Sequence, residues 1–578
     1  MLPTTNLFII KEKKKPPKEY KLQQKKWKIL NRDATKSIVD VVLTNRNLPA
    51  DHMDPFRLSE RMHSPYLLPD MEKGVRRILQ AIENEEKILV FGDYDVDGIT
   101  STALMVFFFR KINYPVEFML PHREKDGYGL RISAVEEIAK NNVKLIITVD
   151  NGISSHEAIE LATEKGIDVV VTDHHLQEGT LPPAAAVINP NRSDSEYPFK
   201  TICGAAVAFK VIYALAEKVM PEADYKDFLM NHLDLVAIGT ISDVMPLRDE
   251  NYALVKFGLK VLSGTKKPGL IELKKISGVK EKEVSPVSVG FFLGPRLNAS
   301  GRLESAEIAL KLLITPSMDE ARDLAQYLDG LNRKRQGLQN DYLTQALNKV
   351  EDQKEAIDKV IFVENEDWQA GLIGLVSGRL KELYARPAFA FTVDSEGNYV
   401  GSARSIDAFH VTNALTRFKE YFITYGGHHK AAGLTVAPEK YEEFKEKFTS
   451  FGNETLKEED LIPILEIDSV VDIDQINMGN TRMISEVGPF GETNPEPVFV
   501  LNGSKIRDIM LLSGGKHLKL VIEKGNQSFE CVWWNAGSYK DQIRFGDIVS
   551  TAFKLSINNW RGSERLQLVV EDMKYSEN

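Results

Sequence analysis

Short apolar runs alternate with helix-like segments from about residue 87 to residue 190. Five runs are short and rich in β-branched residues, as in strands that are buried on both faces; they lie at 87–91, 116–120, 144–149, 168–172 and 184–188. Three intervening segments have helical spacing, at 99–112, 133–142 and 154–166. This alternation predicts a parallel sheet with helices on both of its faces.

The pattern then changes twice. Residues 203–350 are mostly helix-like, and their longest stretch predicts a helix that bridges two lobes. A second α/β segment follows, with predicted strands at 359–364, 387–393 and 399–405 and a predicted helix at 371–384. From about residue 462 short strands and turns dominate, and the alternation of Leu518, Leu520 and Ile522 predicts a small β-barrel or sandwich.

A chain of 578 residues is too long for one hydrophobic core, so several domains are expected. We predict a basic disordered tail, a parallel-sheet domain, a helical region with a connecting helix, a smaller α/β domain and a β-rich domain. Their predicted boundaries are 1–26, 27–245, 246–350, 351–455 and 456–578.

Composition narrows the class of protein. No uncharged apolar run reaches the length that spans a bilayer, and at the N-terminus an apolar patch precedes the lysines, which reverses the order of a secretory signal. We therefore expect a cytoplasmic protein that is not inserted in a membrane. The net charge of −10 argues against indiscriminate coating of a polyanion. The lysines between residues 11 and 28 suit a solvated tail, with weak electrostatic help to nucleic acid as the alternative.

Ionisable residues follow the ends of three predicted strands. Because parallel strands bring their carboxyl ends to one edge of a sheet, these side chains are expected to converge there. Only two cysteines occur, Cys203 and Cys531, so a metal at this edge would need oxygen and imidazole ligands. The candidates, including one acid after a predicted helix, are Asp93, Asp95, Asp97, Asp150, Asp173, His174, His175 and Asp243.

Clustered carboxylates repel one another unless cations hold them, and carboxylate with imidazole favours Mn²⁺ or Mg²⁺ over Zn²⁺. Two such ions roughly 3.5–4 Å apart are suited to hydrolysis of a phosphate ester. A calcium loop is the alternative for the segment that starts at Asp93. An EF-hand would need a glutamate at its twelfth position, where the chain has Leu104.

The motifs "DYDVDG" (93–98), "VDNG" (149–152), "DHH" (173–175) and "GTISD" (239–243) resemble, in this order, those of the DHH phosphoesterase superfamily. Further stretches resemble its RecJ family of single-strand-specific exonucleases, among them "LPHREKDGYGL" (120–130), "GPRLNASGRLESA" (294–306), "GSARS" (401–405), "GGHHKAAG" (426–433) and "GPFGETNPEPVF" (488–499). The resemblance implies an α/β chain with a parallel-sheet DHH domain, a long connecting helix, a smaller α/β DHH-associated domain and a C-terminal OB-fold β-barrel.

The resemblance also implies roles for the clustered residues. Two divalent cations, Mn²⁺ or Mg²⁺, would be held by Asp95, Asp97, Asp150, His174 and Asp243, with Asp93 as a further candidate. Asp150 would bridge both ions. His175 would donate a hydrogen bond to the scissile phosphate, and Asp173 would orient an imidazole or a loop amide.

Further residues are expected to bind substrate. By resemblance, Arg123, Ser402 and Arg404 would form a pocket for a 5′-terminal phosphate; a surface strand charge is the alternative for Arg404. Arg296, Asn298 and Arg302 would contact the strand, with helix-end salt bridges as the alternative. The remaining candidates are Tyr128, His428 and Lys430.

Aromatic residues in the β-rich domain are candidates for base stacking. They are Phe529, Trp533, Trp534 and Trp560. Since neighbours on a strand face opposite ways, we expect one of the two adjacent tryptophans to lie in the core and the other to be exposed.

The resemblance implies an exonuclease that degrades single-stranded DNA from its 5′ end to nucleoside 5′-monophosphates in DNA repair and recombination. We expect a monomer whose substrate is 5′-phosphorylated single-stranded DNA, with a helicase and a single-strand-binding protein as partners. One alternative is a DHH phosphodiesterase acting on oligoribonucleotides or cyclic dinucleotides. Another is a non-catalytic scaffold that binds single strands.

Overall fold

The computed structural model describes residues 25–54, 59–123, 127–177, 179–279, 284–351, 357–560 and 563–576. All but two residues of the predicted basic tail, 1–26, lie outside this part. The chain forms two compact units. The larger unit holds residues 46–457 and 483–496, and the smaller unit holds the described residues of 1–45, 458–482 and 497–578.

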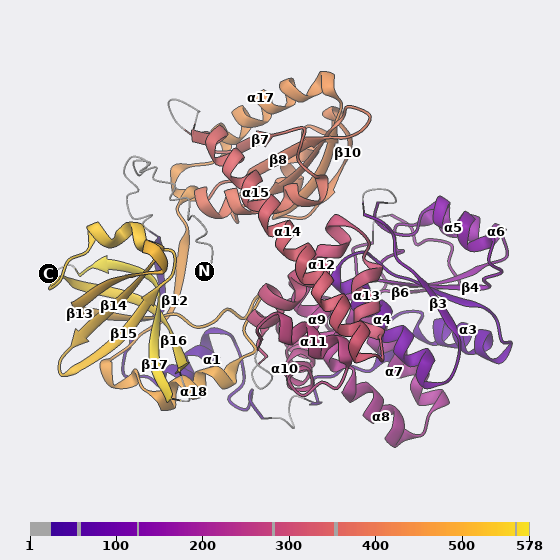
Figure 1. The fold of residues 1–578 in the computed structure, drawn as a ribbon, viewed down its shortest axis with the longest axis horizontal. Helices are drawn as coiled ribbons and strands as arrows, with labels where there is room; N and C mark the ends of the chain where they lie inside the picture. The colour runs from indigo at the N-terminus through magenta and orange to yellow at the C-terminus, as the bar shows by residue number, and fades with distance from the viewer. Residues whose placement is uncertain are drawn as a thin grey trace, which may run out of the picture. The chain divides into compact units, whose positions relative to one another are not determined.

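A five-stranded parallel sheet forms the first half of the larger unit (Figure 1), which confirms the predicted βα alternation. Its order is β3-β2-β4-β5-β6, and its strands are β2 (Ile88–Phe91), β3 (Val116–Met119), β4 (Leu145–Val149), β5 (Asp168–Thr172) and β6 (Ala186–Ile188). Successive residues enter two different hydrophobic clusters: Ile147 packs with α4 (Val96–Lys111) and α7 (Gly204–Val219), and Ile146 with α5 (Ile132–Ala139) and α6 (His156–Glu164). Burial on both faces explains the unbroken apolar runs.

The strand order reverses beside β2. This strand pairs with β3 on one side and with β4 on the other, so the connections that leave β2 and β4 diverge. In open α/β sheets such a point leaves a crevice at the carboxyl ends of the strands, where ligands bind. The residues that follow β2 and β4 therefore border a binding crevice.

Helices connect this sheet to a second one. They include α9 (Leu233–Ser242), α10 (Asp249–Ser263), a π-helix at Ser288–Leu293, α12 (Gly294–Leu303) and α13 (Glu307–Ile314). The predicted bridging helix is α14 (Met318–Glu351), whose 34 residues span about 50 Å at 1.5 Å per residue. It packs against both α12 and α15 (Ala370–Tyr384).

The second sheet has the order β10-β11-β9-β8-β7. Its three predicted strands are present as β7 (Ile361–Glu364), β8 (Ala388–Val393) and β9 (Tyr399–Arg404). Two further strands, β10 (Phe422–Gly427) and β11 (Ala431–Val436), form an antiparallel hairpin that contains the "GGHHKAAG" stretch. The helix α15 packs against β8 and β9.

The smaller unit contains the predicted barrel. Strand β13 (Phe499–Leu512) pairs with β14 (His517–Lys524) and also with β16 (Ile548–Trp560), which closes the order β13-β14-β15-β17-β16 into a ring. The remaining strands are β15 (Gln527–Trp533) and β17 (Ser563–Tyr575). Leu518, Leu520 and Ile522 are fully buried, as their alternation predicts.

The boundaries of this unit differ from the predicted ones. Strand β1 (Lys26–Asn31) pairs in parallel with β12 (Ile464–Val470), which in turn pairs with β13. Residues 27–45 therefore belong with the C-terminal barrel and not with the first sheet domain, because Trp27 and Ile29 pack on the core around Ile467. Conversely, residues 483–496 belong to the larger unit.

The barrel separates the aromatic candidates. Trp533 is buried, whereas Trp534 is 53% exposed with its ring edge against His517, so one tryptophan is core and the other exposed, as predicted. Phe529 is also buried, which rules out base stacking by its ring in this conformation, because it points from β15 into the barrel. The side chain of Trp560 lies outside the described residues.

Candidate metal centre and phosphate site

The loop after β2 wraps around the first turn of α4. Asp95 caps this helix, and its Oδ1 accepts hydrogen bonds from the N–H groups of Asp97 and Gly98 at 2.9 and 3.1 Å. Gly98 has no room for a side chain, since a Cβ there would lie 2.5 Å from the backbone nitrogen of Asp93. The "DYDVDG" spacing is therefore a helix cap that turns three carboxylates toward the end of β2.

The carboxylate of Asp97 is held by a second helix. Its two oxygens accept hydrogen bonds from the N–H groups of Gly204 and Ala205, at 2.6 and 2.9 Å, at the start of α7. A helix N-terminus stabilises negative charge, which suits a fully buried carboxylate. Gly204 is also required by close packing, since a Cβ there would lie 2.6 Å from Oδ1 of Asp150.

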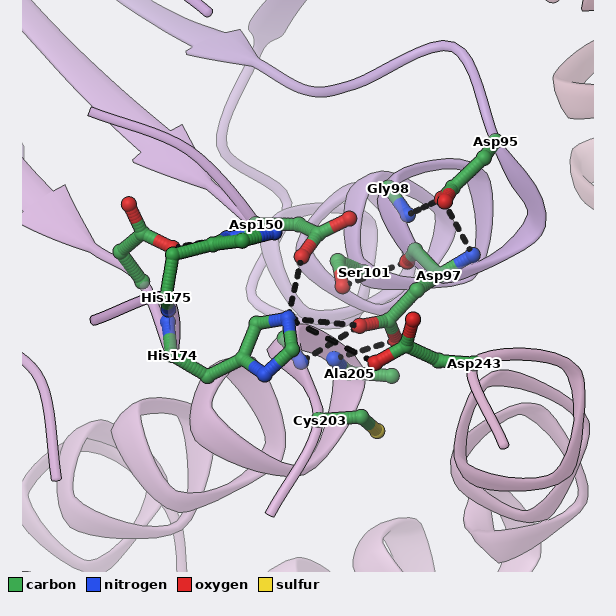
Figure 2. Close-up of polar contacts among 12 residues, drawn as sticks. Asp95, Asp97, Gly98, Ser101, Asp150, His174, His175, Cys203, Ala205 and Asp243 are labelled. Carbon is green, nitrogen blue, oxygen red and sulfur yellow. Dashed lines mark hydrogen bonds and ion pairs between the residues drawn. The ribbon is translucent and has the colours of Figure 1, made fainter. Parts of the chain in front are cut away.

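The imidazole of His174 points into a group of three carboxylates (Figure 2). Its Nε2 lies 3.1 Å from Asp150 Oδ1, 3.6 Å from Asp243 Oδ2 and 3.7 Å from Asp97 Oδ2. These residues come from the ends of β4, β5, α9 and the first turn of α4, which are far apart in the chain. The topology thus places four of the predicted ligands around one point.

Burial perturbs the ionisation of these acids. Desolvation, together with repulsion from neighbouring carboxylates, raises the pKa of Asp93, Asp150 and Asp243 well above its usual value. Burial likewise raises the pKa of Asp97 and lowers that of His174. Each shift disfavours the charged form of its group. Cations in this cluster would restore the charged carboxylates, and the neutral imidazole favoured at His174 is the form that binds a metal.

The donor atoms fit divalent ions. Within the part of the chain that the structure describes, Asp93 Oδ1, Asp150 Oδ1, His174 Nε2 and Asp243 Oδ2 are buried and make no hydrogen bond; His174 Nε2 has only the close approaches to carboxylates given above. Three groups have ligand atoms within 4.8 Å of one another: Asp97, His174 and Asp243; Asp93, Asp95 and Asp150; and Asp150, His174 and His175. Carboxylate oxygens with one or two imidazoles suit Mn²⁺ or Mg²⁺.

His175 is held beside this cluster by hydrogen bonds. Its Nδ1 lies 2.8 Å from Asp173 Oδ1 and 2.9 Å from the hydroxyl of Tyr128. Burial would lower the pKa of His175, but the Asp173 carboxylate outweighs it and raises this pKa to about 9. The fully buried Asp173 also accepts hydrogen bonds from three backbone N–H groups, those of Ile153, His174 and His175. Although burial alone would raise its pKa, the hydrogen bond and charge of His175 lower it to about 2.

Four arginines lie close together in the same unit: Arg123, Arg302, Arg335 and Arg404, called the guanidinium group below. Burial, with repulsion from Arg123, Arg335 and Arg404, lowers the pKa of Arg302 to about 9. Burial and Arg123 likewise lower the pKa of Arg404. Their hydrogen bonds go to neutral acceptors: Arg302 donates to the carbonyl of Gly371, and Arg404 to the carbonyl of Ala403 and the hydroxyl of Ser402. Asp95 also attracts Arg302, but none of these arginines forms an ion pair with another described residue. Crowded guanidinium groups of this kind suit an anion, and phosphate matches their geometry.

Other predicted substrate residues have different surroundings. Arg296 forms an ion pair with Asp329 of α14 at 2.9 Å, as its salt-bridge alternative predicts. Its contact with the strand stays a prediction. Lys430 is paired with Asp407 at 2.6 Å. His428 is exposed at the end of the β10–β11 hairpin, and Asn298 lines a cavity together with Arg302.

Two functional features were missed from the sequence. The N–H groups of Gly204 and Ala205 hold Asp97, and the glycine after Cys203 at the start of an apolar helix was the available signal. Arg335 joins the guanidinium group from the middle of α14, where a single arginine on a long polar helix gives no signal.

The fold and the site indicate a class of protein: an α/β phosphoesterase with a candidate carboxylate–imidazole metal centre and a candidate phosphate site. Family models agree with it. Residues 87–240 match the DHH family N-terminal domain, residues 357–454 the DHHA1 domain and residues 467–572 the RecJ OB domain.

Curated relatives and solved structures extend this match. The single-stranded-DNA-specific exonuclease RecJ of Haemophilus influenzae is 35% identical over 535 residues, covering 89% of this chain and 92% of the relative. The RecJ of Bacillus subtilis is 36% identical over 89% of this chain, which spans 64% of that longer protein. The crystal structure of RecJ in complex with Mn²⁺ from Thermus thermophilus matches with a TM-score of 0.79 at 27% identity, over 96% of this chain and 80% of that one. The chain belongs to the RecJ family of single-stranded-DNA-specific exonucleases.

No helix among the described residues combines the length and apolar character needed to cross a membrane.

Proposed function

We propose that this chain is a metal-dependent exonuclease that degrades single-stranded DNA in the 5′ to 3′ direction and releases nucleoside 5′-monophosphates. Two divalent cations, Mn²⁺ or Mg²⁺, would be held by Asp93, Asp95, Asp97, Asp150, His174 and Asp243, with Asp150 shared between them. Such ions lower the pKa of bound water and stabilise the attacking and leaving oxygens of a phosphodiester. Asp150 belongs to two of the three groups of ligand atoms, one with Asp93 and Asp95 and one with His174, which supports a shared role for it.

His175 would act on the scissile phosphate. Its Nδ1 is engaged by Asp173, so the other ring nitrogen, Nε2, remains to donate a hydrogen bond to a phosphate oxygen. Against the effect of burial, the Asp173 carboxylate raises the pKa of His175 to about 9, which favours contact of this ring with an anion. Asp173 is a positioning residue, because it fixes the ring through Nδ1 and does not reach the substrate.

The guanidinium group would set the 5′ to 3′ direction of degradation. A terminal 5′ phosphate bound by Arg123, Arg302, Arg404 and Ser402 would place the first phosphodiester at the metal centre. A strand end that lacks this phosphate would lose the charge-assisted hydrogen bonds. The observation that carries the proposal is this pairing, within one compact unit, of an anion site with a carboxylate–imidazole cluster.

The test compares 30-residue single-stranded DNA with a 5′ phosphate and with a 5′ hydroxyl, in Mn²⁺. We expect faster degradation of the phosphorylated strand by the wild type, stepwise release of mononucleotides, and at least a 10-fold smaller preference for the phosphate in Arg404→Ala. Asp150→Ala should abolish activity. Hydrolysis of an RNA dinucleotide alone, or unchanged activity of Asp150→Ala, would contradict the proposal.

We further propose a helicase and a single-strand-binding protein as partners in DNA repair and recombination, since the substrate must first be unwound. The test mixes the full chain with a purified helicase or a purified single-strand-binding protein at moderate salt and measures whether the two proteins elute together.

A further inference from the structure

A cavity of about 440 Å³ adjoins the metal-centre residues in the larger unit. Ser242 and Val244, the two neighbours of Asp243, form one side of it. Arg302 and Arg335 of the guanidinium group form another side. The cavity therefore lies between the chain neighbours of one candidate metal ligand and the candidate phosphate site, and its volume lies in the range of small-ligand pockets, roughly 300–1,000 Å³.

The walls of this cavity between its charged ends are apolar. They include Met245 and Leu247 after α9, Phe291 of the π-helix and Leu375 of α15. Phe291 is 74% exposed, and Val287 beside it is 57% exposed. Large apolar side chains that are exposed together at a cavity indicate a ligand or partner site, whereas single exposed apolar residues are common on any surface. A π-helix is itself a feature that is frequent at functional sites.

Val244 adopts a backbone conformation that its side chain disfavours. The helix α9 ends in a Schellman motif, in which Met245 N–H donates to Thr240 O at 3.0 Å and Val244 N–H to Ile241 O at 3.2 Å. This motif places Val244 at the left-handed position, with φ of 55°, where glycine is usual and a β-branched residue is a true outlier. The side chain is 62% exposed, so core packing does not explain why a valine stands there.

A loop from the C-terminal third of the chain forms one wall of the cavity, with Phe490, Gly491 and Glu492 as the lining residues. Two hydrogen bonds hold this loop in place: Leu247 N–H donates to Glu492 O at 2.9 Å, and the hydroxyl of Tyr252 donates to Gly488 O at 2.8 Å. This is the "GPFGETNP" stretch, and its placement gives that motif a role as a cavity wall.

We propose that this cavity binds the base of the 5′-terminal nucleotide, with Val244 as the base contact nearest the metal centre. The inference rests on the proposed function. A nucleotide whose 5′ phosphate lies at the guanidinium group and whose 3′ phosphate lies at the metals would extend between the two sides of the cavity. Its base, turned aside, would lie against the apolar walls. Base stacking on apolar and aromatic side chains is tolerant of sequence, as a general exonuclease needs.

The same pocket would select single strands. A base can enter this apolar cavity only if it is unpaired and unstacked from its neighbour, so a base-paired end would first have to open. The contact of Val244 with the base would then explain why a valine occupies a strained backbone position, because such strain is found at functional sites.

The test uses oligonucleotides that carry a single abasic residue at the first or the second position from a phosphorylated 5′ end. For the wild type in Mn²⁺ we expect KM for the first cleavage to rise about 10-fold to 100-fold when the first base is missing. It should be unchanged when only the second is missing. Val244→Gly should raise KM on the intact strand by a similar factor, add nothing on the strand without its first base, and unfold at the same or a higher temperature.

Two further variants separate binding from folding. Phe291→Ala removes an exposed ring, so it should raise KM without lowering stability. Ala385→Gly relieves a second left-handed residue, with φ of 52°, that does not line the cavity, so it should leave KM unchanged. Equal KM values of the wild type on intact and abasic ends, or a wild-type KM in Val244→Gly, would overturn the base pocket alone. A wild type that degrades no single-stranded DNA in Mn²⁺ would overturn the proposed function itself.

Discussion

Asp97 and Gly204, 107 residues apart in the chain, are joined by a 2.6 Å hydrogen bond from the glycine N–H to the carboxylate. The same glycine lies against Asp150. One residue at the start of α7 thus fixes two candidate metal ligands, one through its backbone and one through its lack of a side chain.

Replacing Gly204 by alanine should disrupt this arrangement. The added Cβ would lie 2.6 Å from Asp150 Oδ1 and 2.6 Å from Asp150 Cβ, so the carboxylate must move. We expect at least a 100-fold loss of nuclease activity and weaker Mn²⁺ binding, with a stability loss of about 1–3 kcal/mol. Gly330→Ala in α14, where a Cβ meets nothing within 4 Å, is the matched control and should keep full activity. Wild-type activity of the Gly204 variant would show that Asp150 tolerates displacement.

Removing one carboxylate should stabilise the metal-free protein. Burial and the neighbouring acids raise the pKa of Asp243, which means that its charged form opposes folding. In EDTA, Asp243→Asn should unfold at a higher temperature than the wild type, by roughly 2–4 °C for about 1 kcal/mol. In Mn²⁺ the order should reverse, because the variant lacks a ligand. Asp319→Asn, at an exposed position on α14, should behave as wild type in both conditions. A lower unfolding temperature of Asp243→Asn in EDTA would contradict the repulsion argument.

The N-terminal strand should stabilise the C-terminal barrel. Trp27 Nε1 donates a 2.7 Å hydrogen bond to Oδ2 of the buried Asp572. Trp27→Phe leaves that carboxylate without this donor, so we expect the smaller unit to lose about 1–3 kcal/mol in urea unfolding. The double variant with Asp572→Asn should lose less than the sum of the two single variants. Strict additivity would mean that the two side chains do not interact.

Acid should destabilise the larger unit through His232. Burial, then the charge of Lys267, lowers the pKa of His232 to about 4. The unfolded chain, with the ordinary value near 6.5, therefore binds more protons between these two pH values. Stability should be complete above pH 6.5 and fall as the pH drops toward 4, by up to about 3 kcal/mol. His232→Asn should flatten this part of the stability–pH curve, while the exposed His428→Gln should not. Equal slopes for wild type and His232→Asn would contradict the assignment.

The pattern of apolar and polar residues along the chain was sufficient to predict the parallel strands and the acidic cluster at their ends. The unbroken apolar runs gave the parallel strands, and the acids at their ends gave the cluster, because both follow from a periodicity of neighbours in the chain. The β10–β11 hairpin and strand β1 were not predicted, since their few apolar positions become meaningful only when they pair with distant strands. Arg335 and the Gly488–Glu492 wall were missed for the same reason: each acquires a role only through tertiary contact. Asp93 has a ligand atom close to those of Asp95 and Asp150, which spacing alone did not decide.

The helix α14 is held at two points along its length. Asp329 is paired with Arg296, and Gln345 accepts a 2.9 Å hydrogen bond from the indole of Trp368. These two anchor points are 16 residues, or about 24 Å, apart along a rod that cannot shorten without breaking its own backbone hydrogen bonds. Within the larger unit, such a rod fixes how far Arg296 of α12 lies from Trp368 of the second sheet domain along its axis. The two sheets therefore cannot move closer along this direction without unwinding the helix.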